Sequence, residues 1–243
     1  MEIRSERVQI PVGSARMGGY LVRPNDSASH PGVIVWMEIF GVNAHIREVT
    51  ERVAREGYVA LAPDFFHRTH PGIELGYDEA GMATGMKGLM ALDAETMIAD
   101  AQAAVSFLRK QPGVSGKIGA MGFCIGGHMT YLTACETDVA AAASFYGGGI
   151  AAPKGPGGKA STLSRTPKIQ GKILCLMGAK DSLIPMAQVD AIREALKASG
   201  ARHEVIVYDA DHGFFCNERG SYHKPSADDA WQRVKALFAS ELK

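Results

Sequence analysis

Strongly apolar stretches alternate along this chain with stretches in which apolar residues recur every three or four positions. Residues 32–37 (GVIVWM) are continuously apolar, and 117–123, 139–146 and 172–178 are also rich in apolar residues. Such runs are typical of strands that are buried on both faces of a parallel sheet. Because helical spacing follows each of them, the pattern predicts strands and helices in alternation from about residue 32 to the end.

The remaining elements follow from the same two periodicities. Two alternating segments, 3–10 and 18–24, flank a turn that contains glycine and predict an antiparallel hairpin at the N-terminus. Further strands are predicted over 58–64 and 203–209. Helices are predicted over 44–56, 93–110, 125–135, 185–200 and 226–242. The expected fold is α/β, with a mostly parallel central sheet, an N-terminal hairpin and helices on both faces.

Two segments lack a clear period. Residues 65–92 are rich in glycine and methionine, and residues 147–171 are rich in glycine, proline and lysine. We expect both segments to be long and irregular, because connections of this length in a compact domain are usually functional or mobile. A substrate pocket would be built largely from them.

Composition narrows the class of protein. The 243 residues fit a single domain over 1–243, and the 26 basic residues balance the 26 acidic ones. No basic stripe predicts nucleic-acid binding, and no apolar run is long enough to predict a membrane span. The first residues contain Glu2 and Arg4 and show no secretory signal, and the four cysteines form no C-x-x-C pair. These features indicate a cytoplasmic protein with free thiols.

Three chemically capable residues come just after three predicted strands. They are Cys124, Asp181 and His212, in that order. Residues 122–126 (GFCIG) fit the nucleophile-elbow pattern G-x-S-x-G with cysteine in place of serine. This turn needs glycine on both sides of the nucleophile, because a side chain there would clash with neighbouring backbone.

The thiol needs a base to become a nucleophile at neutral pH. A free thiol with a pKa of about 8.5 is only about 3% ionised at pH 7. The dipole of the following helix contributes about 0.3–1 kcal/mol, which is less than one pKa unit. We therefore expect His212 to act as the base and Asp181 to orient it.

With a fourth motif, residues 37–43 (MEIFGVN), the chain resembles the dienelactone hydrolase family of α/β-hydrolases over its full length. The resemblance implies the α/β-hydrolase fold and hydrolysis of an ester or lactone through a thioester, without a cofactor. It further implies that Glu38 hydrogen-bonds the resting thiol and that the Ile39 and Ile125 amides form the oxyanion hole. Since a carboxylate beside Cys124 repels a thiolate, we expect a neutral thiol at rest.

The chain departs from the family pattern at the arginines that bind a substrate carboxylate. The position four residues after His212 holds Cys216, and residues 71–92 contain only one basic residue, Lys87. Arg68, Arg219 or Lys87 could substitute, and the sequence does not choose among them. An anionic lactone therefore loses its obvious anchor.

For several other candidate residues, packing in the core is an equally good explanation. Five aromatic residues in predicted strand-end loops could line the substrate pocket: Phe40, Tyr77, Tyr146, Phe214 and Phe215. His67 and His70 are three residues apart, but two histidines do not make a metal site and we expect no metal.

The expected partner is a small-molecule ester or lactone. We expect a monomer or a small homo-oligomer. Two alternatives remain open on the same fold. The triad could act on a different acyl or phosphotriester substrate, or the protein could be a thiol redox sensor or a ligand-binding pseudoenzyme, with Cys216 as a resolving thiol.

Overall fold

Eight strands form one hydrogen-bonded sheet in the computed structural model, which describes residues 1–243. The strand order is β1-β2-β4-β3-β5-β6-β7-β8. The strands are β1 (Ile3–Val12), β2 (Ala15–Pro24), β3 (His30–Trp36), β4 (Val59–Pro63), β5 (Val114–Phe123), β6 (Ala141–Phe145), β7 (Lys172–Gly178) and β8 (His203–Tyr208). Strand β2 pairs antiparallel with both β1 and β4, whereas all pairings from β4 to β8 are parallel. The predicted sheet and hairpin are confirmed.

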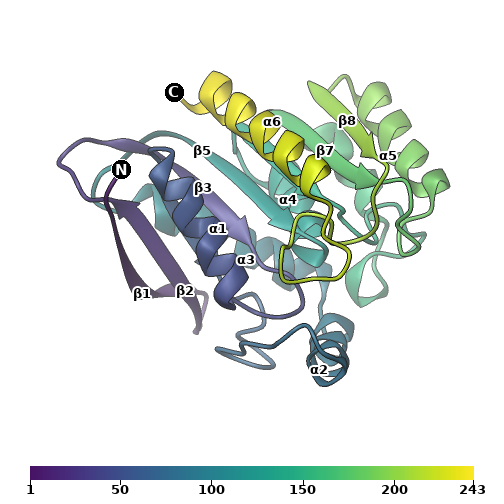
Figure 1. Cartoon of the computed structure of the whole chain (residues 1–243), viewed down its shortest axis with the longest axis horizontal. Helices are drawn as coiled ribbons and strands as arrows, with labels where there is room; N and C mark the ends of the chain where they lie inside the picture. Colours follow the sequence, from purple (N-terminus) through teal and green to yellow (C-terminus); the bar gives the residue numbers. More distant parts are fainter.

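Helices cover both faces of the sheet. They are α1 (Ala44–Arg55), α2 (Glu79–Met90), α3 (Ala94–Arg109), α4 (Ile125–Glu136), α5 (Met186–Ser199) and α6 (Lys224–Leu242), with short 3-10 segments at Pro156–Gly158 and Thr162–Lys168. In Figure 1, α1 and α6 cross the near face, while α3 and α4 lie behind the sheet. Helix α2 stands apart from the others, beyond the carboxyl ends of β3 and β5.

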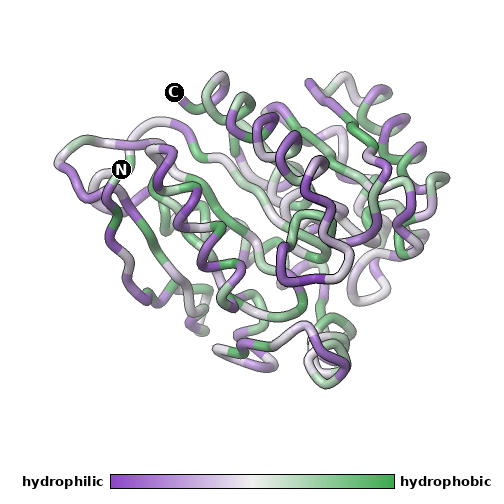
Figure 2. Tube along the Cα trace, viewed as in Figure 1, coloured by the Kyte–Doolittle hydropathy of each residue, from purple (hydrophilic) through white to green (hydrophobic).

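The core lies between these helices and the central strands. Val33, Ile34, Val35 and Trp36 of β3 are all fully buried, as expected for a strand covered on both faces. Figure 2 shows hydrophobic colour along the central strands and hydrophilic colour on the outward turns of α1 and α6. Since each parallel strand ends at the same edge, the loops that follow β3, β5, β7 and β8 converge there.

The expectation of an irregular segment over residues 65–92 is wrong in part, because this segment contains α2. The Asp78 carboxylate caps the helix by accepting a hydrogen bond from the Gly81 amide at 2.7 Å. The buried positions of the helix are the glycines Gly81, Gly85 and Gly88. Periodicity rules look for apolar side chains on the inward face, and this face has none.

Element ends differ slightly from the predicted ones. Strand β5 begins at Val114, three residues before the predicted start, and α6 begins at Lys224, with Pro225 in its first turn. Helix α5 ends where Gly200 adopts a left-handed conformation with φ 71°, as predicted. None of the helices is both long and apolar enough to cross a membrane.

Candidate active site

Cys124 lies at the turn between β5 and α4. Its φ of 57° and ψ of −121° are rarely adopted by residues other than glycine, so the turn is strained. A Cβ on Gly122 would collide with the carbonyl oxygen of Gly126, and a Cβ on Gly126 would collide with the carbonyl oxygen of Met37. The two glycines therefore permit the bend, as the sequence pattern predicts, and they leave the thiol partly exposed.

His212 and Asp181 come from the loops after β8 and β7 and contact each other. His212 Nδ1 lies 2.7 Å from Asp181 Oδ2, and both side chains are almost completely buried. The second carboxylate oxygen accepts hydrogen bonds from the amides of Leu183 at 2.9 Å and Ile184 at 3.2 Å. Asp181 is thus held in place and fixes the orientation of the imidazole.

The other ring nitrogen, His212 Nε2, is buried and has no hydrogen-bond partner. Burial opposes the charged imidazolium, but the Asp181 hydrogen bond and the neighbouring Cys124 outweigh it and raise the pKa of His212 to about 10. Cys124, Asp181 and His212 are therefore brought together in the order and at the strand ends that the sequence predicts.

Two backbone amides near Cys124 have no partner in the fold. Ile125 is the first residue of α4, so its N–H has no acceptor within the helix. Ile39 follows β3, and its N–H donates to no acceptor in the chain. Both residues line the same cavity as Cys124. The amides could together hold a negatively charged oxygen.

Glu38 differs from the expectation based on the family resemblance, because its carboxylate is not hydrogen-bonded to the thiol. It accepts hydrogen bonds from Arg219 at 3.0 Å and from the Tyr77 hydroxyl at 3.4 Å. Burial raises the pKa of Glu38, and Arg219 opposes this shift. A guanidinium stabilises a fully buried carboxylate more strongly than a thiol does, because it is a charged hydrogen-bond donor. The Glu38–Arg219 ion pair is therefore favoured over a hydrogen bond to the thiol.

Arg219 is the one of the three suggested basic residues that reaches the site. Gly213 makes this possible, because a Cβ at that position would overlap the guanidinium. Lys87 does not line the cavity, and Arg68 binds the Asp100 carboxylate at 2.7 Å instead. Nothing in the spacing of Arg219, seven residues after His212, could have distinguished it in the sequence.

The cavity over Cys124 has a volume of about 420 Å³. It is lined by Ile39, Phe40, Met82, Met86, Leu89, Leu92, Cys124, Ile125, His128, Gly148, Gly149, Ala152, Lys154, Gly155, Pro156, Leu183, His212 and Arg219. The segments 65–92 and 147–171 supply many of these residues, as expected. Sequence reasoning did not identify the α2 methionines or His128, whose ring bonds the Gly148 carbonyl and Thr162.

Of the five aromatic pocket candidates, Phe40 alone lines the cavity. Phe214 and Phe215 are buried and pack with Phe145 in the core, because the chain turns inward directly after His212. Tyr77 is half-buried and packs against the Phe40 ring, and its hydroxyl donates to Glu38 and accepts from Asn43. A strand-end position therefore does not by itself place a side chain in the pocket.

Tyr146 packs against His212. Its ring centroid is 5.0 Å from that of His212, and its φ of 36° is unusual for a tyrosine. The hydroxyl is buried without a partner.

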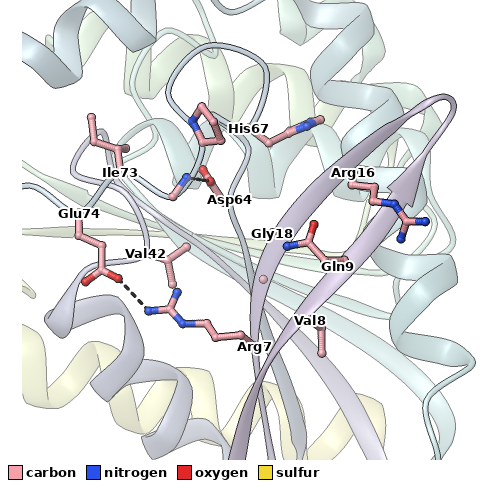
Figure 3. Close-up of a pocket in the computed structure, with 13 residues that line it drawn as sticks. Arg7, Val8, Gln9, Arg16, Gly18, Val42, Asp64, His67, Ile73 and Glu74 are labelled. Carbon is pink, nitrogen blue, oxygen red and sulfur yellow. Dashed lines mark hydrogen bonds and ion pairs between the residues drawn. The ribbon is translucent and has the colours of Figure 1, made fainter.

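A second cavity of about 400 Å³ lies between the β1–β2 hairpin and residues 64–74 (Figure 3). It shares no lining residue with the cavity over Cys124. Glu74 binds both Arg7 and Arg47 beside it, at 2.8 and 2.5 Å. His67 binds Asp100 at 3.1 Å, and no three His, Cys, Asp or Glu side chains gather as metal ligands.

Known proteins resemble this chain in sequence and in fold. The model of the dienelactone hydrolase family matches residues 17–242. A protein of Synechocystis sp. named "Putative carboxymethylenebutenolidase" is 43% identical over 246 residues, which cover 100% of this chain and 99% of the relative. A crystal structure titled "Putative Dienelactone Hydrolase", from Klebsiella pneumoniae, has 33% identity and a TM-score of 0.89, covering 98% of this chain and 99% of that one.

A third similar protein is a dienelactone hydrolase-like promiscuous phosphotriesterase from metagenomic libraries. It shares 26% identity and a TM-score of 0.85, with 99% of both chains covered. The likeness thus extends over both sequence and fold. The chain belongs to the dienelactone hydrolase family of α/β-hydrolases, and it is an enzyme of the ester- or lactone-hydrolysing kind.

Proposed function

We propose that the protein hydrolyses a carboxylic ester or lactone through a Cys124–His212–Asp181 triad and a thioester intermediate. The observation that carries the proposal is the position of His212. One ring nitrogen is bound to Asp181 at 2.7 Å, and the other is free beside Cys124. This is the arrangement that a general base for a thiol requires.

Acylation uses the thiolate–imidazolium pair that forms when the thiol proton of Cys124 moves to His212 Nε2. The raised pKa of His212 belongs to this pair, because Asp181 and the ionised Cys124 both favour the imidazolium. The sulfur then attacks the substrate carbonyl carbon. The carbonyl oxygen becomes an oxyanion and accepts hydrogen bonds from the Ile39 and Ile125 amides. Removal of one such donor costs about 3–4 kcal/mol in the transition state, so the two amides matter as much as the thiol. When the intermediate collapses, the C–O bond breaks and His212 gives its proton to the leaving alkoxide.

Deacylation runs through the same groups. His212 takes a proton from water, and the resulting hydroxide attacks the thioester carbon. The C–S bond then breaks, the carboxylic acid leaves, and Cys124 regains the proton from His212. Asp181 stabilises the imidazolium in both halves of the reaction. The steps use only side chains, backbone amides and water.

A stopped-flow trace with p-nitrophenyl acetate tests the proposal. The unmodified protein is expected to give a burst followed by steady turnover, whereas Cys124→Ala loses the burst and at least about a thousandfold in kcat. Cys135→Ala is the matched control, because this thiol is buried elsewhere and burial raises its pKa to about 12. If Cys124→Ala and the unmodified protein give the same trace, the triad proposal fails.

A phosphotriester is the second candidate substrate, favoured by the similar protein described as a promiscuous phosphotriesterase. A phosphoryl oxygen could use the same two amides. Turnover of paraoxon that Cys124→Ala abolishes would support this candidate, and its absence alongside ester turnover would restrict the site to carboxylic esters.

The redox-sensor alternative depends on Cys216. This thiol is fully buried, and burial together with the Glu38 charge raises its pKa to about 11. A resolving cysteine has to ionise, so these surroundings weigh against the role. Peptide mapping under non-reducing conditions after mild peroxide treatment would reveal a Cys124–Cys216 bridge if the alternative were correct.

A further inference from the structure

We propose that the natural substrate is a neutral ester or lactone with an apolar arm that lies against α2, where Met82 and Met86 select it. The inference rests on the proposed ester hydrolysis at Cys124. It names the chemical class that the cavity accepts.

The wall of the cavity over Cys124 is mostly apolar, which suits an apolar group of a substrate better than an anionic one. Ten of its eighteen lining residues are hydrophobic. Met82 and Met86 are 38% and 41% exposed, and Leu183 is 65% exposed. Large apolar side chains gathered at the mouth of one cavity indicate a ligand that covers them. Methionine is flexible, so this wall can adapt to arms of different shape.

The arginine that lines the cavity is already paired. Arg219 binds the fully buried Glu38 carboxylate at 3.0 Å, so the pair carries no net charge. A substrate carboxylate at Arg219 would have to share the guanidinium with Glu38. Two carboxylates would then face the one positive charge of Arg219, which is unfavourable. Lys154 also lines the cavity, but it is an exposed residue.

Helix α2 is close enough to the reacting centre for its side chains to touch the substrate. Gly85 packs directly on Ile39, since an added Cβ would come within 2.6 Å of the Ile39 carbonyl oxygen. Met82 and Met86 lie one turn apart and therefore on the same face of the helix. Met90 is one turn further on, is 83% exposed and does not line the cavity.

The test compares neutral and anionic p-nitrophenyl esters of similar length. Burial of each added methylene favours the transition state by up to about fourfold, so kcat/KM should rise about tenfold from the acetate to the butyrate. The mono-p-nitrophenyl ester of glutaric acid, which carries a carboxylate, should react at least about tenfold more slowly than the butyrate.

Met86→Lys should lower kcat/KM for the butyrate about tenfold and raise it for the glutarate ester. Met90→Lys adds the same charge one turn away and should change neither value. Met86→Leu keeps the apolar surface and should retain the chain-length preference. Because Met86 is exposed, both lysine variants are expected to keep the melting temperature of the unmodified protein.

The results of these assays distinguish failure of this inference from failure of the proposed ester hydrolysis. If the acetate, butyrate and glutarate esters all turn over and kcat/KM for the glutarate equals or exceeds that for the butyrate, the neutral-substrate inference is overturned. Ester hydrolysis itself would remain supported. Equal effects of Met86→Lys and Met90→Lys would remove the selective role of the α2 methionines. Absence of any acyl-enzyme with every ester would overturn the proposed hydrolysis, and the inference with it.

Discussion

Two residues other than glycine have positive φ, Cys124 and Tyr146, and each begins the loop after one of two adjacent strands, β5 and β6. The elbow geometry accounts for Cys124. At Tyr146, burial and the nearby Glu38 charge raise the pKa well above its ordinary value, so the hydroxyl stays protonated. It has no hydrogen-bond partner, and a buried hydroxyl in that state destabilises the fold.

Replacement of Tyr146 by phenylalanine should therefore raise the free energy of unfolding, by about 1 kcal/mol. Tyr131→Phe is the matched control, because that buried hydroxyl lies 2.7 Å from Thr166 Oγ1. Its loss should destabilise the protein by about 1 kcal/mol. Urea unfolding of both variants gives the signs, and destabilisation by Tyr146→Phe would mean that the hydroxyl has a partner in solution.

Residues at strand ends could be predicted because their positions follow from local pattern. Cys124, Asp181 and His212 each come shortly after a strand, and flanking glycines mark the elbow. Arg219 could not be predicted, since successive turns through Cys216 carry it back towards Glu38. Its place depends on tertiary structure that no spacing rule contains.

Among the helices and strands, α2 is the element whose sequence pattern gives the least indication of its structure and position. Its buried face consists of glycines, and this lets the helix approach Ile39 and the Phe66 ring closely. The same glycines lower the helix propensity of the segment. The sequence therefore indicates an irregular connection where the structure has a helix that borders the active site.

Gly85→Ala tests how closely α2 has to pack. The added methyl group would press on the carbonyl oxygen and side chain of Ile39, whose amide we propose as an oxyanion donor. We expect kcat for p-nitrophenyl acetate to fall at least about tenfold, although alanine favours the helix by about 1 kcal/mol. Gly76→Ala meets nothing closer than 4.0 Å and should leave kcat unchanged. Unchanged activity in Gly85→Ala would show that Ile39 can shift without loss.

For the whole molecule, the ionisation of His212 links the site to stability. Its pKa is raised from 6.5 to about 10 on folding, so protonation of this residue favours the folded state. The stabilisation is fully present below about pH 6.5 and is lost as the pH rises through about 10.

His212→Gln should remove this dependence. We compare the free energy of unfolding of the unmodified protein with that of the variant. Between about pH 6 and pH 10, the difference between the two should shrink by a few kcal/mol, because the pKa shift sets its order of magnitude. Urea unfolding of both proteins at several pH values measures it. A difference that stays constant with pH would indicate that the pKa of His212 is not raised on folding.

For the whole molecule, the alternation of apolar runs and helical segments was sufficient to predict the parallel sheet and the helices on both of its faces. The two alternating segments near the N-terminus were sufficient to predict the hairpin. The two long connections were not predictable in detail. Residues 65–92 and 147–171 are held by contacts with distant parts of the chain, such as Arg165 with Glu136 and Tyr77 with Glu38. Local pattern does not encode such contacts.

The strand order also has a consequence for the order of events during protein synthesis. Cys124 belongs to the centre of the sheet, whereas Asp181 and His212 follow the last two strands at one edge. A ribosome therefore releases the proposed nucleophile well before the proposed base, because the chain emerges from its N-terminus. A nascent chain that has completed β6 can present a thiol but has no means to turn over an ester. Hydrolysis by the proposed triad becomes available only when β8 has joined the sheet.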